Sequence, residues 1–272
     1  MLQHTNKPNN TVGLFALILP FATFALTPLP AYAETPFEAS QQFIETRQIT
    51  EARRALELEL RLRPDNIEAR YNLAVLLEES GHQPEAIVLY QKNMEKSARH
   101  LPSLINLASA LQRSGSTSEA QKWLEKGTKE IKHEATPWYL LAMMFEKRGD
   151  TITATTLHQK ALKADPLNGF AYLHYATFQS GNNLGDLGLK YGAKAIRLLP
   201  QCAPCWSSYA SILQHAGENE EALDAYQRSL SINPDTGTRK KLIGVLRKLG
   251  HLDRAEKMQR GINAWNRSHQ DK

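Results

Sequence analysis

The sequence predicts an all-α protein, an α-solenoid of about seven helix-turn-helix hairpins stacked side by side. The first supporting observation is a repeat, because Gly81, Gly115 and Gly149 lie 34 residues apart. The second is apolar residues at helical spacing on both sides of such a glycine, as in 138–145 and 154–161. The third is the glycine itself, which permits the positive φ of a tight turn.

The composition agrees with this fold class and excludes several others. Of the 272 residues, 42% are hydrophobic and 22% charged, which is typical of soluble globular proteins and not of disordered or collagen-like chains. The net charge of +5 is small for this length, so no nucleic-acid partner is predicted. The motifs HExxH, GxSxG, Walker and Rossmann are missing from the sequence, and we therefore predict no catalytic residue, no metal and no cofactor.

Residues 1–33 are predicted to be a signal peptide. Lys7 precedes an apolar run over 14–26, and the small-x-small pattern Ala31-Tyr32-Ala33 follows it. This run is shorter than the roughly 20 residues that cross a bilayer as a helix, so a retained anchor is the weaker alternative. Cleavage before Glu34 would release an exported chain with no membrane-spanning segment, and the cleavage pattern favours the bacterial periplasm.

Residues 34–269 divide into seven units of one phase. Most units have a small residue at the eighth position and alanine at the twentieth, where two helices cross closely and large side chains do not fit. Proline at position 32 ends the second helix of several units. Counting from residue 33, the units are 33–66, 67–100, 101–134, 135–168, 169–202, 203–235, which is one residue short, and 236–269.

Some units depart from this pattern. The first unit has Arg47 in place of the turn glycine, and the second and third carry Ala98 and Lys132 in place of the proline. The fifth has Asn183 and Gly188 where glycine and alanine are usual, so we expect its packing to be the least regular. Solenoid ends must present a polar face to water, and the first and last predicted helices are both polar.

The motif Trp138-x-x-Leu141-Ala142-x-x-Phe145, followed by Gly149, resembles the tetratricopeptide repeat. The unit 203–235 resembles it equally well, and the resemblance extends over nearly all of the mature chain. It implies a right-handed superhelix whose first helices line a concave face. Proteins of this family use that face to hold peptides and extended segments of partner proteins, so we expect a protein or peptide partner here.

The resemblance also implies which residues line this groove. Asn72 and Asn106 are similar to rungs of an asparagine ladder, in which each side-chain amide donates to and accepts from a peptide backbone. The alternative is that both are solvated helix residues. A clamp for a C-terminal carboxylate is not indicated, because only Lys240 has the right place and it is paired with Gly244. The expected peptide-binding residues are Tyr71, Asn72, Val75, Ile105, Asn106, Ser109, Tyr139, Met143 and Leu173.

Cys202 and Cys205 form a CxxC motif between the fifth and sixth units. A thioredoxin-like site would need a preceding strand, and haem attachment would need histidine where Trp206 stands. A structural disulfide is favoured for an exported chain. Two idle thiols, or redox or metal chemistry, are the alternatives.

The charge is uneven near the C-terminus. Residues 203–236 have a net charge of −4, whereas 237–272 have +7. We interpret the last unit as a basic C-terminal cap, solvated and compensated by its acidic neighbour. The alternative is that it meets an anionic partner or a membrane surface.

Together these patterns predict an exported, non-catalytic scaffold or adaptor. It would hold a peptide or an extended segment of another cell-envelope protein in its concave groove. One alternative is a thiol-disulfide active accessory protein that uses Cys202 and Cys205. Another is a purely structural or self-assembling spacer. The oligomeric state is not specified by the sequence.

Overall fold

The computed structural model describes residues 35–270, which form fourteen α-helices in seven consecutive pairs with no strand in that range. This confirms the predicted all-α solenoid of helical hairpins. The first helices of the pairs are α1 (Pro36–Glu45), α3 (Ile67–Glu79), α5 (Leu101–Arg113), α7 (Thr136–Lys147), α9 (Gly169–Gly181), α11 (Ala203–His215) and α13 (Thr236–Lys248). The second helices are α2 (Ile49–Leu62), α4 (Gln83–Lys96), α6 (Thr117–Glu130), α8 (Thr151–Ala164), α10 (Gly185–Leu198), α12 (Asn219–Ile232) and α14 (Leu252–Gln270).

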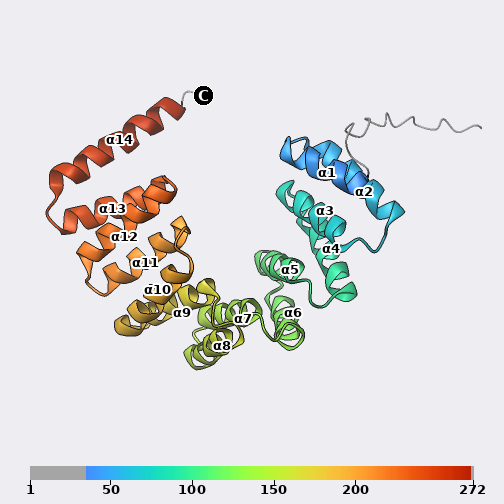
Figure 1. Cartoon of the computed structure of the whole chain (residues 1–272), viewed down its shortest axis with the longest axis horizontal. Helices are drawn as coiled ribbons and strands as arrows, with labels where there is room; N and C mark the ends of the chain where they lie inside the picture. Colours follow the sequence, from blue (N-terminus) through green and yellow to red (C-terminus); the bar gives the residue numbers. More distant parts are fainter. Residues whose placement is uncertain (1–34, 271–272) are drawn as a thin grey trace, which may run out of the picture.

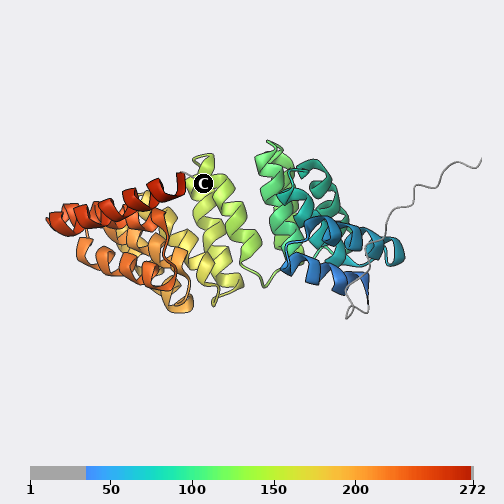
Figure 2. The ribbon, with the colours of Figure 1, turned by 90° about the horizontal axis from the view of Figure 1, so that it is seen from above.

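The hairpins follow one another along an arch, with α1 and α2 at one end and α13 and α14 at the other (Figure 1). Helices α3, α5 and α7 lie nearer the inside of the arch than their partners α4, α6 and α8. Seen from above, successive hairpins stand side by side along the long axis of the molecule (Figure 2). Each helix packs against helices one or two places away along the chain.

The predicted signal peptide, residues 1–33, lies outside the described residues, as does the cleavage point before Glu34. Both stay predictions. Among the helices of residues 35–270, none has the length and apolar character needed to span a membrane.

The core is built on the small residues that set the repeat. Five units have alanine at the eighth position and six have alanine at the twentieth, and every one of these alanines is at most 1% exposed. Their small side chains let the two helices of a hairpin cross closely, and larger apolar residues fill the space beside them. The eighth-position alanines are Ala74, Ala108, Ala142, Ala176 and Ala210, and the twentieth-position alanines are Ala52, Ala86, Ala120, Ala154, Ala222 and Ala255.

Every hairpin turn contains one residue with a positive φ angle. Five of the seven are glycine, such as Gly81 at φ 82° and Gly217 at φ 90°. The other two are Arg47 at φ 58° and Asn183 at φ 61°, at the two turns where the sequence lacks glycine. The turn geometry is therefore the same throughout the array, and side chains other than glycine adopt it where they must.

The fifth unit is closely packed where α10 meets α9 and α11, and the expectation that its packing is the least regular stays a prediction. A Cβ atom added to Gly188 of α10 would lie 3.1 Å from the Cβ of Ser180 and 3.2 Å from the carbonyl oxygen of Ala176, both in α9. One added to Gly192 would lie 2.6 Å from the Tyr209 ring of α11. The glycines thus remove volume at points where α10 meets its neighbours directly.

Candidate functional site

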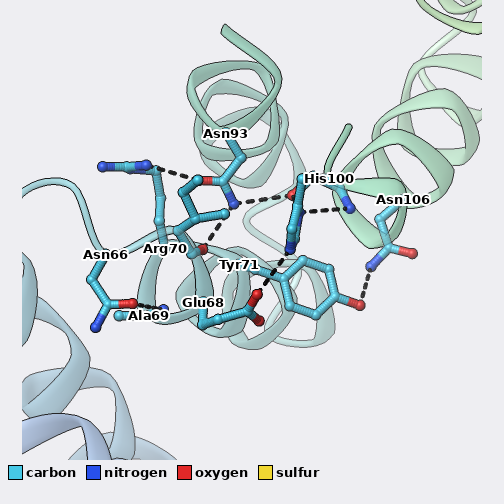
Figure 3. A network of polar contacts seen from close by, with 10 residues as sticks. Asn66, Glu68, Ala69, Arg70, Tyr71, Asn93, His100 and Asn106 are labelled. Carbon is cyan, nitrogen blue, oxygen red and sulfur yellow. Dashed lines mark hydrogen bonds and ion pairs between the residues drawn. The ribbon is translucent and has the colours of Figure 1, made fainter. Parts of the chain in front are cut away.

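Tyr71 of α3 and Asn106 of α5 meet on the inner side of the second and third units. The side-chain nitrogen of Asn106 donates to the hydroxyl oxygen of Tyr71 at 3.3 Å and to that of Tyr90 at 3.2 Å. Figure 3 shows the Asn106 nitrogen directed at the Tyr71 hydroxyl and its oxygen directed away. Because Tyr90 of α4 is fully buried, its hydroxyl is a fixed anchor for Asn106.

The network continues from Tyr90 along the inner surface. The Tyr90 hydroxyl donates to the carboxylate of Glu78 at 2.9 Å, and Arg113 forms an ion pair with the same carboxylate. Arg113 also donates to the Ser109 hydroxyl at 2.7 Å. Burial raises the pKa of Tyr90 although the Asn106 hydrogen bond opposes this, so the phenol stays protonated as the donor to Glu78.

A second cluster beneath this network joins the second unit to the third. The buried side chain of Asn93 accepts from Arg70 at 2.8 Å and donates to Ser103 at 3.0 Å (Figure 3). His100, which caps α5, contacts Ser103 through Nδ1 at 2.8 Å. Its ring lies edge-on to Tyr71, with 5.5 Å between centroids. Tyr71 is therefore held by residues of both units.

Eight of the nine predicted groove residues remain at least partly accessible, and one does not. Tyr71, Asn106, Val75, Ile105 and the others are half-buried, except Ser109, which is exposed. Leu173 is only 8% exposed and packs in the core of the fifth unit. Of the nine residues it therefore offers the least surface to a ligand, and its place in the groove stays a prediction.

The two ladder asparagines are not equivalent. Asn106 uses its amide nitrogen within the protein, as described above, whereas Asn72 has no hydrogen-bond partner among residues 35–270. The resemblance implies two equivalent asparagines. In the structure the Asn106 amide is held by the protein, and the Asn72 amide is not.

Aromatic rings line the inner side of the fourth and fifth units. Tyr139 stacks on His174 with 4.7 Å between centroids. Burial, and then the nearby His158, lower the pKa of His174, so its ring is neutral at pH 7. His158 is itself fully buried and contacts Glu146 through Nε2.

Sequence reasoning missed the polar pairs that support these surfaces, although a periodic signal exists. In the second, fourth and sixth units, the residue at position 24, on the second helix, contacts the residue at position 12, on the first helix of the same hairpin. Tabulating both positions across the units would have shown complementary polar residues in these three. The pairs are Tyr90 with Glu78, His158 with Glu146, and Tyr226 with Gln214.

The CxxC motif closes the turn between α10 and α11. Cys202 is the N-cap residue of α11, and a disulfide joins it to Cys205, which is 1% exposed. The indole nitrogen of Trp206 donates to the carbonyl oxygen of Pro200 at 3.0 Å across the same turn.

Family models for the tetratricopeptide repeat match residues 37–94, 68–162 and 203–236. The chain contains tetratricopeptide repeats. Proteins built from this repeat generally act as non-catalytic scaffolds for protein–protein interaction. The predicted groove residues of this chain, apart from Leu173 on α9, lie on α3, α5 and α7.

Two solved structures support the tetratricopeptide fold. A tetratricopeptide repeat protein from Parabacteroides merdae is 17% identical, with a TM-score of 0.61, over 84% of this chain and 91% of that chain. A chain of the APC/C hetero-tetramer Cut9-Hcn1 is 18% identical, with a TM-score of 0.59, over 78% of this chain but only 42% of that one. At these identities the likeness concerns the fold alone. No curated protein matches the chain.

Proposed function

We propose that this protein is an exported, non-catalytic tetratricopeptide scaffold that holds an extended segment of another cell-envelope protein along its inner face. The observation that carries this proposal is the pairing of Tyr71 with Asn106 over the buried Tyr90. It presents polar atoms at the inner surface in a fixed arrangement.

The hydrogen-bond polarity of this pair suits a peptide group. The side-chain nitrogen of Asn106 donates to the two hydroxyl groups. Within residues 35–270, no group donates a hydrogen bond to the Asn106 side-chain oxygen, and none accepts one from the Tyr71 hydroxyl. One acceptor and one donor therefore remain for a ligand. A backbone N–H can donate to the Asn106 oxygen while a backbone carbonyl accepts from Tyr71, whatever the side chains of the partner.

The surroundings of the pair favour an ordered ligand. Val75 and Ile105 are half-buried beside it, and Tyr139 and Met143 continue this apolar surface into the fourth unit. Such residues can bury the side chains of an extended segment. Because Asn106 is already held by Tyr90, little of its side-chain entropy is lost on binding.

Export to the bacterial periplasm is part of the proposal. It is supported by the signal-peptide pattern of residues 1–33 and by a disulfide, a bond typical of oxidising compartments. N-terminal sequencing after cell fractionation should find the chain in the soluble envelope fraction, beginning at Glu34. Recovery of the full-length chain in washed membranes would contradict export as a soluble protein.

The binding role is tested with the double variant Asn72→Ala and Asn106→Ala. A partner captured from envelope extract should bind this variant more weakly by about 1–3 kcal/mol, the scale of buried hydrogen bonds left unmade. The matched control is Asn263→Ala, an exposed asparagine of α14. Titration calorimetry measures the affinity and circular dichroism checks that helicity is unchanged. Equal affinity of the wild type and the double variant would reject the proposed groove.

A further inference from the structure

The last unit carries a basic stripe, which we define as Lys240, Lys241, Arg247 and Lys248 of α13. Their spacing places them on one face of the helix. The opposite face is buried, with Leu242, Val245 and Leu246 at most 2% exposed. Lys240, Lys241, Arg247 and Lys248 are all exposed, so the stripe faces solvent along the helix.

Two of the four cations, Lys240 and Lys241, stand at positions that hold predicted groove residues in other units. Counted by unit, its residues stand at positions 5, 6, 12 and 13. In the second unit those positions hold Tyr71, Asn72, Glu78 and Glu79. These four positions are neutral or acidic in the second unit, where Glu78 is paired with Arg113, and all four are basic in the last unit.

The acidic neighbours do not neutralise the stripe through ion pairs. Among residues 35–270, no carboxylate lies within ion-pair distance of the four cations, and the sequence-based expectation of compensation by the sixth unit is not met in that form. Lys241 reaches the Ser211 hydroxyl at 3.5 Å. Asp235, the N-cap of α13, has its pKa lowered first by hydrogen bonds from Thr238 and least by Lys241.

The middle of the stripe is open. Gly244 lies between the two pairs of cations, and a Cβ atom added there would meet nothing within 4 Å. Four cations around an unfilled surface suit a chain of carboxylates, each of which can pair with Lys or Arg.

We propose that the basic stripe binds an acidic segment of the partner protein, continuing the groove of the second to fourth units. This inference rests on the proposed function and adds the chemistry and the orientation of the ligand. In this arrangement the partner's acidic residues bind at α13, and the segment whose backbone is hydrogen-bonded by the protein binds at α3 and α5. A peptide is favoured over a lipid surface because Lys240 and Lys241 stand at the same unit positions as the predicted groove residues Tyr71 and Asn72.

The test uses a fluorescein-labelled decapeptide of glutamate and glycine and measures anisotropy at low and at 0.5 M salt. The double variant Lys240→Gln and Arg247→Gln should weaken binding at least tenfold and reduce its salt dependence. The matched control, Lys257→Gln with Arg260→Gln, removes the same charge from exposed sites of α14 and should bind like the wild type. Thermal unfolding of both variants establishes that they are folded.

Three outcomes would overturn the inference. The decapeptide fails to bind the wild type, or both double variants lose affinity equally, or the wild type binds vesicles containing anionic lipid and not the peptide. The Asn72→Ala and Asn106→Ala variant should leave decapeptide affinity unchanged. Loss of partner binding in that variant, without any decapeptide binding to the wild type, would reject the stripe and leave the proposed function intact. The reverse result would reject the groove of the second to fourth units and retain the stripe.

Discussion

Arg47 occupies a backbone conformation that suits glycine. Its φ of 58° is left-handed, and the equivalent residue is glycine in five of the other six hairpin turns. For a residue with a Cβ this region costs about 1–2 kcal/mol. Asn183, the other exception, belongs to a residue type that enters this region more readily.

Replacing Arg47 by glycine should stabilise the protein. The relief of backbone strain exceeds the larger entropy that glycine loses on folding, and a net gain of roughly 0.5–1 kcal/mol is expected. Urea unfolding followed by circular dichroism measures the change. The control is Arg47→Ala, which removes the long side chain and keeps the Cβ, and it should give no such gain. A lower unfolding midpoint for the glycine variant would show that the arginine side chain stabilises this turn.

At this scale the sequence predicts where residues lie better than what they contact. The 34-residue phase placed Tyr71 and Asn106 on the inner face, but not the hydrogen bonds through Tyr90, because contacts between helices depend on side-chain lengths that the period does not contain. Leu173 also shows this dependence on packing. It has the phase of a groove residue, yet close packing of α9 buries it.

At the scale of helices, two glycines of similar appearance in the sequence have opposite roles. Gly192 lies in α10 at a close contact with Tyr209, and Gly244 lies in α13 beside open space. The first removes volume where two helices meet. The second weakens a helix without serving its packing.

The variants Gly192→Ala and Gly244→Ala should therefore differ in sign. The added methyl group at residue 192 must displace the Tyr209 ring and should destabilise by about 1–3 kcal/mol. At residue 244 it should stabilise by roughly 0.5–1 kcal/mol through helix propensity alone. Each variant is the control for the other in thermal unfolding. A gain in stability at residue 192 would mean that α10 and α11 do not approach as closely as described.

The elements themselves were well predicted, because their determinants are local. Alanine at the eighth and twentieth positions marks most of the hairpins, a turn residue of positive φ marks all of them, and these features are present in the structure. The packing of the fifth unit was not predicted. In the sequence, Gly188 stands where most other units have alanine. The position of α9 in the structure shows that the lack of a Cβ at Gly188 allows α10 to contact α9 directly.

On the scale of the whole molecule, the array depends on its last unit to cover the sixth. Tyr226 and Leu223 of α12 belong to the same buried cluster as Leu242 and Ile243 of α13. The outer face of α14 carries exposed charged residues and ends the stack in water.

Truncation after Pro234 should therefore expose the apolar side of α12 and cause aggregation. Size-exclusion chromatography with light scattering measures the oligomeric state, and thermal unfolding measures the loss of stability. The full mature chain at equal concentration is the reference. A monomeric truncated chain of undiminished stability would show that α13 and α14 are not a cap.

The packing of each helix mainly on helices one or two places away also affects how the chain folds. Contacts between residues close in sequence require little loop closure, and proteins rich in them fold quickly. Folding of such an array can begin in any pair of neighbouring hairpins and spread outward. The groove around Tyr71 and Asn106 needs only the second and third units, so it can form while the C-terminal hairpins are still unfolded. During synthesis from the N-terminus, the basic stripe on α13 is completed after the surface around Tyr71 and Asn106, because α13 follows α3 and α5 in the chain.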